Sequence, residues 1–415
     1  MVPLSVLIKV ILVNYLLIFT AADYLFQNQN SSLPYGTVIR TGAGSFYPIV
    51  KIIENPESTT ILRKQDGWVE IKLLDGKSGW ISENVLRKEK VESDYLKRLK
   101  ESTEGVEVSR AVVVSAVKGF GDRYREAIAK GSSDSFALDR QQITPQMWYD
   151  FVKRHYGSKG EKRWSNDKKL RRFTKSVHTS YLERELGLYI AASLVKGKQI
   201  SDRRTEAYLS LIATALVRQS EAPNLSVRVY LFHSEKPAAY ATPNGMIFIS
   251  DELLKLVKNE AELAGLLGHE IAHIVHRHAA MELEKRKTEI SAEMAFGEIR
   301  RLTGLSPMEK HLEDLALAIY DVVNRGYIEE YEKDADRLGS IYAYRAGWVA
   351  TEYRNLVERL SKHPAMVKDF FDAEYSLTDP FEGRLDALTK LKTKLKKHKG
   401  RVTTTPEFKR VRGHK

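Results

Sequence analysis

The chain has 415 residues, of which 43% are hydrophobic, and a chain of this length is expected to form two or three domains. It contains no cysteine, which excludes a disulfide framework and a lipid-modified N-terminal cysteine. Residues 390–415 hold eleven Lys or Arg against one Glu, so they carry +10 of the formal net charge of +12. The rest of the chain is nearly neutral, and we therefore expect no nucleic-acid-binding surface.

Residues 1–22 have the pattern of an export signal. The stretch from Leu4 to Phe19 is mostly apolar, and Thr20-Ala21-Ala22 supplies the small residues that a signal peptidase prefers. The stretch is short for a membrane span of about twenty apolar residues, so a cleaved signal peptide is favoured over an uncleaved N-terminal anchor. We predict an exported protein that is periplasmic or membrane-associated on the periplasmic side.

Residues 33–88 form a separate unit, in which short apolar runs alternate with Gly, Asn-Pro and Asp-Gly turn signals. Trp68 and Trp80 each follow a glycine, and the pattern predicts a small antiparallel barrel. The unit resembles a bacterial SH3-like domain, which implies a cell-wall or peptide ligand. The alternative is that both tryptophans are core residues of a spacer. The resemblance is carried by Arg40, Gly42, Gly44, Tyr47, Gly67-Trp68 and Gly79-Trp80-Ile81.

Residues 89–184 are interpreted as a helical linker region, with a helix expected over Val112 to Ala129. Further on, Ser226 to Phe232 alternates at period two, and Pro243-Asn244-Gly245 is a turn signal before the apolar run Met246 to Ile249. These runs predict a small sheet with a β-hairpin, and residues 239–241 are expected near its edge.

Residues 269–273 read His-Glu-Ile-Ala-His, within a run from Asn259 to His278 that is helical in pattern. On a helix His269 and His273 project from one face, one turn apart, so two imidazoles can reach one tetrahedral ion. Glu270 could then act as general base on a zinc-bound water, whose pKa falls to about 7. The motif alone is moderately specific, but a buried His and Glu need partners, and a metal is one.

The stretch Glu329 to Gly339 (EEYEKDADRLG) also reads as a helix and offers a third ligand. Glu332 could bind zinc while Asp336, one turn on, accepts the free N–H of a ligating imidazole. The alternative is a solvated acidic face, which is the expectation for Glu329, Glu330 and Asp334.

The two motifs in this order, H-E-x-x-H and then E-x-[E/Q/D]-A-D-x-x-G, resemble peptidase family forty-eight of the metallopeptidases. The family includes HtpX, the CAAX prenyl protease and periplasmic quality-control proteases. The resemblance covers roughly residues 185–390 and implies a gluzincin-type zinc metallopeptidase domain, mainly α with a short β-hairpin sheet. It assigns zinc to His269, His273 and Glu332. In such metallopeptidases the substrate adds as a strand to the sheet edge.

One departure concerns the segment after the second motif. Many periplasmic members have Thr-His-Pro followed by an Arg, and that His can approach the zinc as a gate. This chain has Thr378-Asp379-Pro380 and then Arg384. Asp379 stands where the His is usual, so a His-type gate is in doubt, although Asp379 could cap a helix or reach the metal as a gate. Arg384 could stabilise the oxyanion or, as we favour, pair with an acidic neighbour. His276 and His278 are expected to pack or hydrogen-bond rather than bind zinc.

The sequence thus predicts a multidomain zinc metalloendopeptidase with one zinc per chain, acting on misfolded envelope proteins. A zinc-containing chaperone-like or scaffold protein is the alternative, and a cell-wall peptide hydrolase ranks third. The basic C-terminal tail, residues 391–415, could contact an anionic membrane or envelope polymer, or be a disordered solubilising tail.

Overall fold

The structure, a computed structural model, divides the chain into two compact units, Met1–Lys90 and Val91–Lys415. The residues it describes are 30–86 except 35 and 55, then 116, 117, 119, 143–157, 181–195, 199–200, 202–285, 306–363, 381–395 and 400–413. The predicted export signal, most of the helix expected over Val112 to Ala129, and Asp379 lie outside these residues.

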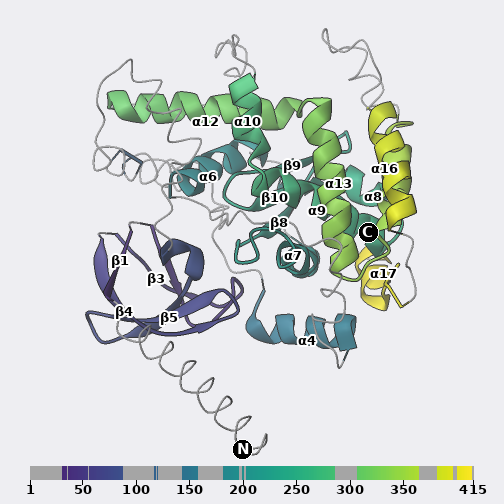
Figure 1. The fold of residues 1–415 in the computed structure, drawn as a ribbon. Coiled ribbons are helices and arrows are strands. Elements are labelled where there is room, and N and C mark those ends of the chain that lie inside the picture. Colours follow the sequence, from purple (N-terminus) through teal and green to yellow (C-terminus); the bar gives the residue numbers. More distant parts are fainter. Residues whose placement is uncertain are drawn as a thin grey trace, which may run out of the picture. The chain divides into compact units, whose positions relative to one another are not determined.

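The first unit is a six-stranded antiparallel sheet in the order β1-β4-β5-β6-β2-β3 (Figure 1). Its first strand begins at Asn30, upstream of the predicted start at residue 33. The 3₁₀ helix η1 (Glu83–Leu86) closes the unit. The strands are β1 (Asn30–Leu33), β2 (Val38–Arg40), β3 (Ile49–Ile52), β4 (Glu57–Gln65), β5 (Trp68–Leu73) and β6 (Ser78–Ser82).

The two tryptophans of this unit are core residues. Trp68 and Trp80 are buried, and the guanidinium of Arg63 lies over the Trp80 ring at 5.0 Å from its centroid. The alternative is therefore correct in taking both tryptophans as core residues, whereas the role of the unit as a spacer stays a prediction. Exposed apolar side chains lie instead on β3, at Ile49 and Val50.

The second unit contains a four-stranded sheet in the order β7-β8-β10-β9. The predicted hairpin is formed by β9 and β10, which are antiparallel and joined through Pro243-Asn244-Gly245. Gly245 has φ +87°, and a Cβ there would collide with the Ser226 carbonyl oxygen, so the turn requires glycine. β8 pairs with β10 in parallel, which the alternating pattern did not predict. The strands are β7 (Gln199–Ile200), β8 (Arg228–Phe232), β9 (Ala239–Ala241) and β10 (Met246–Ser250).

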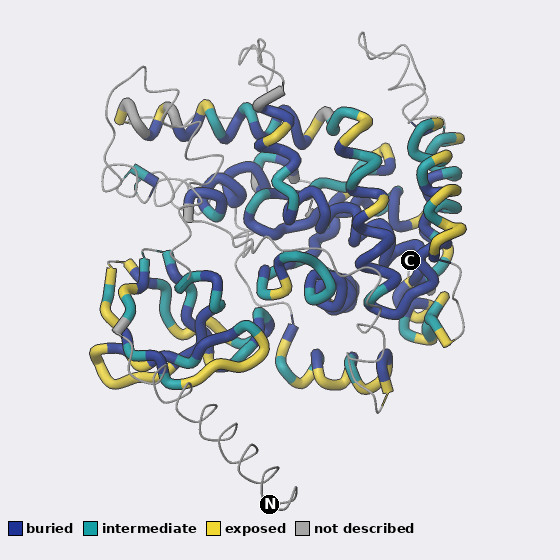
Figure 2. Tube along the Cα trace, viewed as in Figure 1, coloured by how far each residue is buried: buried dark blue, intermediate teal, exposed yellow. Residues whose placement is uncertain are grey.

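Helices surround this sheet, and α9 lies at their centre, in contact with α7, α13, α14 and β9. Figure 2 shows that α9 and β10 are buried, whereas α4 and α16 expose one side to solvent. The described helices are α4 (Pro145–Tyr156), α6 (Tyr181–Val195), α7 (Arg203–Val217), α8 (Asp251–Leu256), α9 (Glu260–Val275), α10 (His278–Lys285), α12 (Pro307–Arg325), α13 (Glu329–Arg345), α14 (Tyr353–Leu360), α16 (Glu382–Lys394) and α17 (Pro406–Gly413), with the 3₁₀ helix η4 (Ala350–Glu352).

The helix predicted over Asn259 to His278 is interrupted, and this is a correction. α9 ends at Val275, and Arg277 adopts the left-handed region with φ +54° before α10 begins at His278. A left-handed non-glycine residue costs about 1–2 kcal/mol. Here Arg277 is held by its Nε, 2.8 Å from Glu183 Oε1. The break turns the chain, so that α10 packs against α12 and α9 instead of extending α9.

The C-terminal residues are also ordered, so the disordered-tail alternative is wrong for residues 400–413. Val402 pairs with Trp348 in a parallel bridge, and the Ala261 amide donates to the Thr403 carbonyl oxygen at 2.9 Å. α17 buries Phe408 and Val411. The C-terminal segment therefore belongs to the second unit. No helix in the described part of the chain combines the length and apolar character needed to cross a membrane.

Candidate metal centre

The helix α9 holds the two histidines of the first motif in a fully buried position. Asn259 caps it, accepting a hydrogen bond from the Glu262 amide at 2.9 Å, and every residue from Glu260 to Val275 is buried. His269 and His273 are 5% and 3% exposed. Polar side chains this deep are stable only with partners, so the surrounding elements must supply them.

The second motif reaches these histidines because α9 and α13 cross at two glycines. A Cβ on Gly268 would lie 2.6 Å from the Gly339 carbonyl oxygen, and a Cβ on Gly339 would collide with the His269 amide nitrogen. The two backbones are thus in direct contact. This approach brings the first two turns of α13, with Glu332 and Asp336, against the imidazoles.

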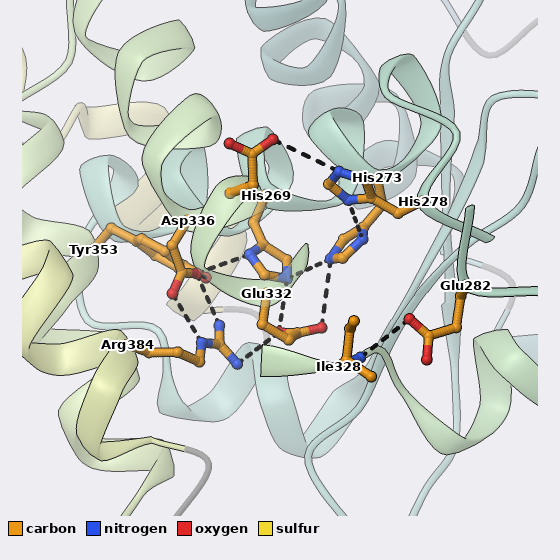
Figure 3. A network of polar contacts seen from close by, with 10 residues as sticks. His269, His273, His278, Glu282, Ile328, Glu332, Asp336, Tyr353 and Arg384 are labelled. Atoms are coloured by element: carbon orange, nitrogen blue, oxygen red, sulfur yellow. Dashed lines mark hydrogen bonds and ion pairs between the residues drawn. The ribbon is translucent and has the colours of Figure 1, made fainter. Parts of the chain in front are cut away.

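Three side chains converge at the crossing (Figure 3). The Nε2 atoms of His269 and His273 are 3.0 Å apart. Glu332 Oε2 lies 3.4 Å from His269 Nε2, and Glu332 Oε1 lies 3.5 Å from His273 Nε2. The predicted ligand set is therefore brought together in space.

The geometry and chemistry of these donors fit zinc. A tetrahedral zinc with bonds of ~2.0–2.1 Å has ligand atoms about 3.3 Å apart, close to the three separations found here. Burial lowers the pKa of His273 well below its ordinary value, so its imidazole is neutral and has a lone pair for a metal. Two imidazole nitrogens and one carboxylate are a ligand set known for catalytic zinc, which keeps a further position open.

The sequence predicted that Asp336 contacts one of the ligating imidazoles, and the structure places it beside His269. Its Oδ1 lies 2.8 Å from His269 Nδ1, which directs Nε2 of that ring toward the ligand cluster. Asp336 Oδ1 also accepts from the Tyr353 hydroxyl at 3.0 Å. Arg384 donates to both Asp336 oxygens at 2.8 Å, and its second terminal nitrogen lies 2.7 Å from Glu332 Oε2. Burial alone would raise the pKa of Asp336, but Arg384 and His269 hold it well below the usual range.

Glu270 follows His269 on α9 and is 6% exposed. Burial raises the pKa of Glu270 to about 7, with the negative charge of Glu332 acting in the same direction. A carboxyl group with a pKa near the working pH can both accept and release a proton. The site thus combines the predicted ligands with an ionisable group suited to proton transfer.

Asp334 departs from the solvated acidic face predicted for it. Its Oδ2 lies 3.7 Å from Nε2 of the buried His278, and its Oδ1 accepts from Arg337 at 2.5 Å. Burial opposes ionisation, but these two partners hold the pKa of Asp334 at about 2. Glu329 and Glu330 are exposed, as expected.

Sequence reasoning missed three contributors to the site. Tyr353 lies beyond both motifs, and no pattern marked it. The Tyr327 ring stacks on His273, with centroids 4.1 Å apart and planes at 15°. Glu282 of α10 accepts from the Ile328 amide at 3.4 Å, at the start of α13, where no side chain of α13 provides a cap. A fourth residue beside the cluster, His278, lies five residues after His273 in the sequence. The sequence predicted that it packs or hydrogen-bonds rather than binds zinc.

Two family models match this chain. Peptidase family M48 matches residues 203–392, and the bacterial SH3 domain matches residues 36–87. The first match contains the whole ligand cluster, Asp336 and Arg384, and the second contains strands β2 to β6 and η1 of the first unit but not β1.

The relatives are distant. The chain is 25% identical to a "Beta-barrel assembly-enhancing protease" of Yersinia pestis over 234 residues, which cover 54% of this chain and 47% of the relative. It is 30% identical to "Mitochondrial metalloendopeptidase OMA1" of Schizosaccharomyces pombe over 79 residues, 19% of this chain and 23% of that one. A "Protease HtpX homolog" of Thermodesulfovibrio yellowstonii is 29% identical over 92 residues, 21% and 31% of the two chains. In each case less than half of the relative's length is matched.

Proposed function

We propose, from the premise that residues 203–392 are a peptidase family M48 domain, that this protein is a zinc-dependent metalloendopeptidase with one zinc per chain. The observation that carries the proposal is the convergence of His269, His273 and Glu332 at the separations of a tetrahedral zinc site. Glu270, buried on the same helix, supplies the ionisable group that peptide hydrolysis needs.

The roles follow from the contacts of each side chain. His269, His273 and Glu332 would hold zinc, which when bound supplies Lewis-acid polarisation and acidifies water. Glu270 accepts the proton of the attacking water and passes it to the leaving amine. Asp336 fixes the orientation of His269, and Arg384 fixes Asp336 and Glu332 rather than contacting the substrate. A gate at Asp379 remains a prediction.

The sheet offers a place for an extended peptide. In the order β7-β8-β10-β9, β9 is an edge strand, and it contacts α9. A pocket at the end of β9 is lined by Ala241, Thr242 and Pro243 together with His273 and Tyr327. A substrate strand added to β9 would therefore lie beside the ligand cluster.

We propose misfolded or misassembled envelope proteins as substrates and an exported, periplasmic or membrane-associated location. The name of the Yersinia pestis relative, a beta-barrel assembly-enhancing protease, supports this, as does the predicted export signal. For the SH3-like domain we propose a peptide or cell-wall ligand. Its buried tryptophans cannot supply the contact surface, whereas the exposed Ile49 and Val50 of β3 can.

The test is metal content and casein cleavage on purified residues 23–415, with and without a chelator. The wild type is compared with Glu270→Gln and with Glu330→Gln, a control on the exposed side of α13. We expect stoichiometric zinc in all three proteins and cleavage by the wild type and the control, abolished by the chelator. Removal of the base should slow cleavage by ~10²–10⁴-fold.

Three results would contradict the proposal in whole or in part. Absence of zinc from the wild type would remove the metal site. Zinc in all three proteins with no cleavage by any would favour the scaffold alternative. Equal cleavage by Glu270→Gln and the wild type would reject Glu270 as the base while leaving the metal site intact.

A further inference from the structure

The second imidazole of the cluster, His273, has a partner that comes from the break after α9. Because Arg277 adopts a left-handed conformation, α10 starts in a new direction and places His278 beside His273. The Nδ1 atoms of the two rings are 3.0 Å apart, and His278 is 1% exposed. His273 therefore presents Nε2 to the ligand cluster and Nδ1 to His278, as Figure 3 shows.

The far side of His278 faces α13. His278 Nε2 lies 3.7 Å from Asp334 Oδ2. The His278 ring stacks on Tyr331, with centroids 4.9 Å apart and planes at 14°, and His273 is stacked on Tyr327. Two tyrosines thus hold the planes of both imidazoles. His273, His278 and Asp334 form a row of polar groups, with 3.0 Å between the first two and an ion-pair separation of 3.7 Å between the last two.

The direction of the protons along this row is fixed by simple chemistry. A neutral imidazole carries one N–H, so a metal on His273 Nε2 leaves the proton of that ring on Nδ1. Among the contacts of the described residues, His278 Nδ1 is the group that faces this N–H, and it then accepts the hydrogen bond. The proton of His278 then resides on Nε2, where Asp334 is the facing acceptor.

We propose that His278 and Asp334 are positioning residues for His273, matching on this imidazole the role that Asp336 has on His269. The inference rests on the proposed zinc site and deepens it. Partners of this kind fix the ring orientation of a metal ligand, and their loss typically weakens metal affinity by ~10–100-fold. α10 supports this arrangement at a second point, because Glu282, one turn after His278, accepts from the Ile328 amide at the start of α13.

The same atoms allow a different arrangement, a second metal site. Donor atoms of His276, His278 and Asp334 also lie within 4.8 Å of one another. His278 cannot serve both purposes, because a neutral ring that accepts from His273 at Nδ1 has its proton on Nε2 and no lone pair there. Occupation of the first site thus excludes metal on His278 Nε2, and one zinc per chain is expected.

The experiment measures the zinc dissociation constant of the full chain by chelator competition, together with zinc stoichiometry and the melting temperature of the zinc-free protein. His278→Asn and His278→Gln are compared, because an Asn amide reaches the position of Nδ1 and a Gln amide that of Nε2. His276→Asn is the control, since its Nε2 faces Glu221 at 3.7 Å. We expect His278→Gln to weaken zinc binding ~10–100-fold, and His278→Asn and the control to remain within a few-fold of the wild type.

Asp334→Ala tests the contact between His278 and Asp334. It should weaken zinc binding in the wild-type background and have no effect in His278→Asn, because Asn does not reach Asp334. If the contribution of Asp334 is purely electrostatic, Asp334→Ala should weaken zinc binding equally in both backgrounds. That result would reject the positioning of His273 through His278 and Asp334.

Further results separate this inference from the proposed function. A wild type that binds no zinc would overturn the zinc site itself. The wild type could bind zinc normally while His278→Asn and His278→Gln lose zinc affinity equally, or in proportion to the fall in melting temperature. Either result would overturn the positioning role of His278 and Asp334 alone. Two zinc ions per wild-type chain, reduced to one by His276→Asn, would establish the second metal site in its place.

Discussion

Arg384 illustrates at the scale of one residue how the site is held in place. Its side chain is 13% exposed and contacts both Asp336 and Glu332, two carboxylates one turn apart on α13. Without a cation between them, the buried Asp336 and half-buried Glu332 carboxylates would repel each other. Arg384 therefore stabilises the arrangement of α13 side chains that faces the histidines, and it does so from a different helix, α16.

We expect Arg384→Gln to lower the free energy of unfolding of the zinc-free protein by about 3–5 kcal/mol, because it leaves the buried Asp336 without its main cationic partner. The stability of Arg384→Lys should fall between those of the wild type and Arg384→Gln, since an ammonium keeps the charge but not the bidentate geometry. Urea unfolding followed by far-UV ellipticity measures this loss. Arg354→Gln, which breaks the more exposed pair with Glu358, is the matched control and should change stability by less than about 1 kcal/mol. Equal losses in the two Gln variants would contradict a special role for Arg384.

At the scale of elements, the site depends on how closely α9 and α13 approach. The helix backbones touch at Gly268 and Gly339, and each glycine lies beside a functional residue or one turn from it along its helix. The second motif includes Gly339, and the structure gives this glycine a physical reason: only a residue without a side chain lets Glu332 come within 3.5 Å of His273 Nε2.

Gly268→Ala should therefore separate the two helices and weaken zinc binding, while costing about 1–3 kcal/mol of stability through overpacking. Chelator competition and thermal unfolding measure the two effects. Gly383→Ala in α16 is the control, because a methyl group there meets only the ends of the flexible Glu329 and Lys333 side chains. The control should be neutral or gain up to ~1 kcal/mol from better helix propensity. A Gly268→Ala protein with unchanged zinc affinity would show that the close crossing does not set the ligand geometry.

The elements also show what the sequence could and could not predict. Ligand spacing in α9 was predictable, because residues four apart on a helix share a face. The second motif predicted a contact between Asp336 and one of the two imidazoles, but it did not say that His269 would be the one. The break at Arg277 was not predictable, because the spacing of apolar residues does not show that an arginine adopts the left-handed region. For the same reason the contact between His278 and His273 could not be predicted, since it requires the chain to turn.

Strand pairing set a similar limit. The turn residues Pro243-Asn244-Gly245 predicted the β9–β10 hairpin because that contact is local. The parallel pairing of β8 with β10 joins segments separated by β9, and alternation at period two does not distinguish parallel from antiparallel partners. Long-range contacts such as those of Arg384 and Tyr353 with Asp336 likewise have no local signature.

At the scale of the whole molecule, the two units have separate cores, and the C-terminal residues belong to the second. Composition suggested a basic appendage, yet several of its polar groups are engaged in the fold. The Arg401 guanidinium lies over the Tyr344 ring at 3.4 Å from the centroid. Arg412 donates to the carbonyl oxygens of Lys255 and Lys258 at the end of α8. Basic charge near helix carbonyls is stabilising, so part of the positive charge serves the fold.

The carboxylate of Glu260, at the start of α9, connects this segment to the zinc helix. Glu260 is 1% exposed and accepts from the Tyr208 hydroxyl at 2.7 Å, from Trp348 Nε1 at 2.9 Å and from the Thr405 hydroxyl. We expect Thr405→Val to lower the free energy of unfolding of the second unit by about 1–3 kcal/mol, because it removes the hydroxyl that donates to the buried Glu260 carboxylate and accepts from the Phe408 amide. The transition of the SH3-like unit should not change, since its core is separate. Differential scanning calorimetry of the full chain measures both transitions, and Thr404→Val, at an exposed neighbouring position, is the control. A shift of both transitions by Thr405→Val, or an equal effect of the control, would contradict a specific connection between the C-terminal segment and α9.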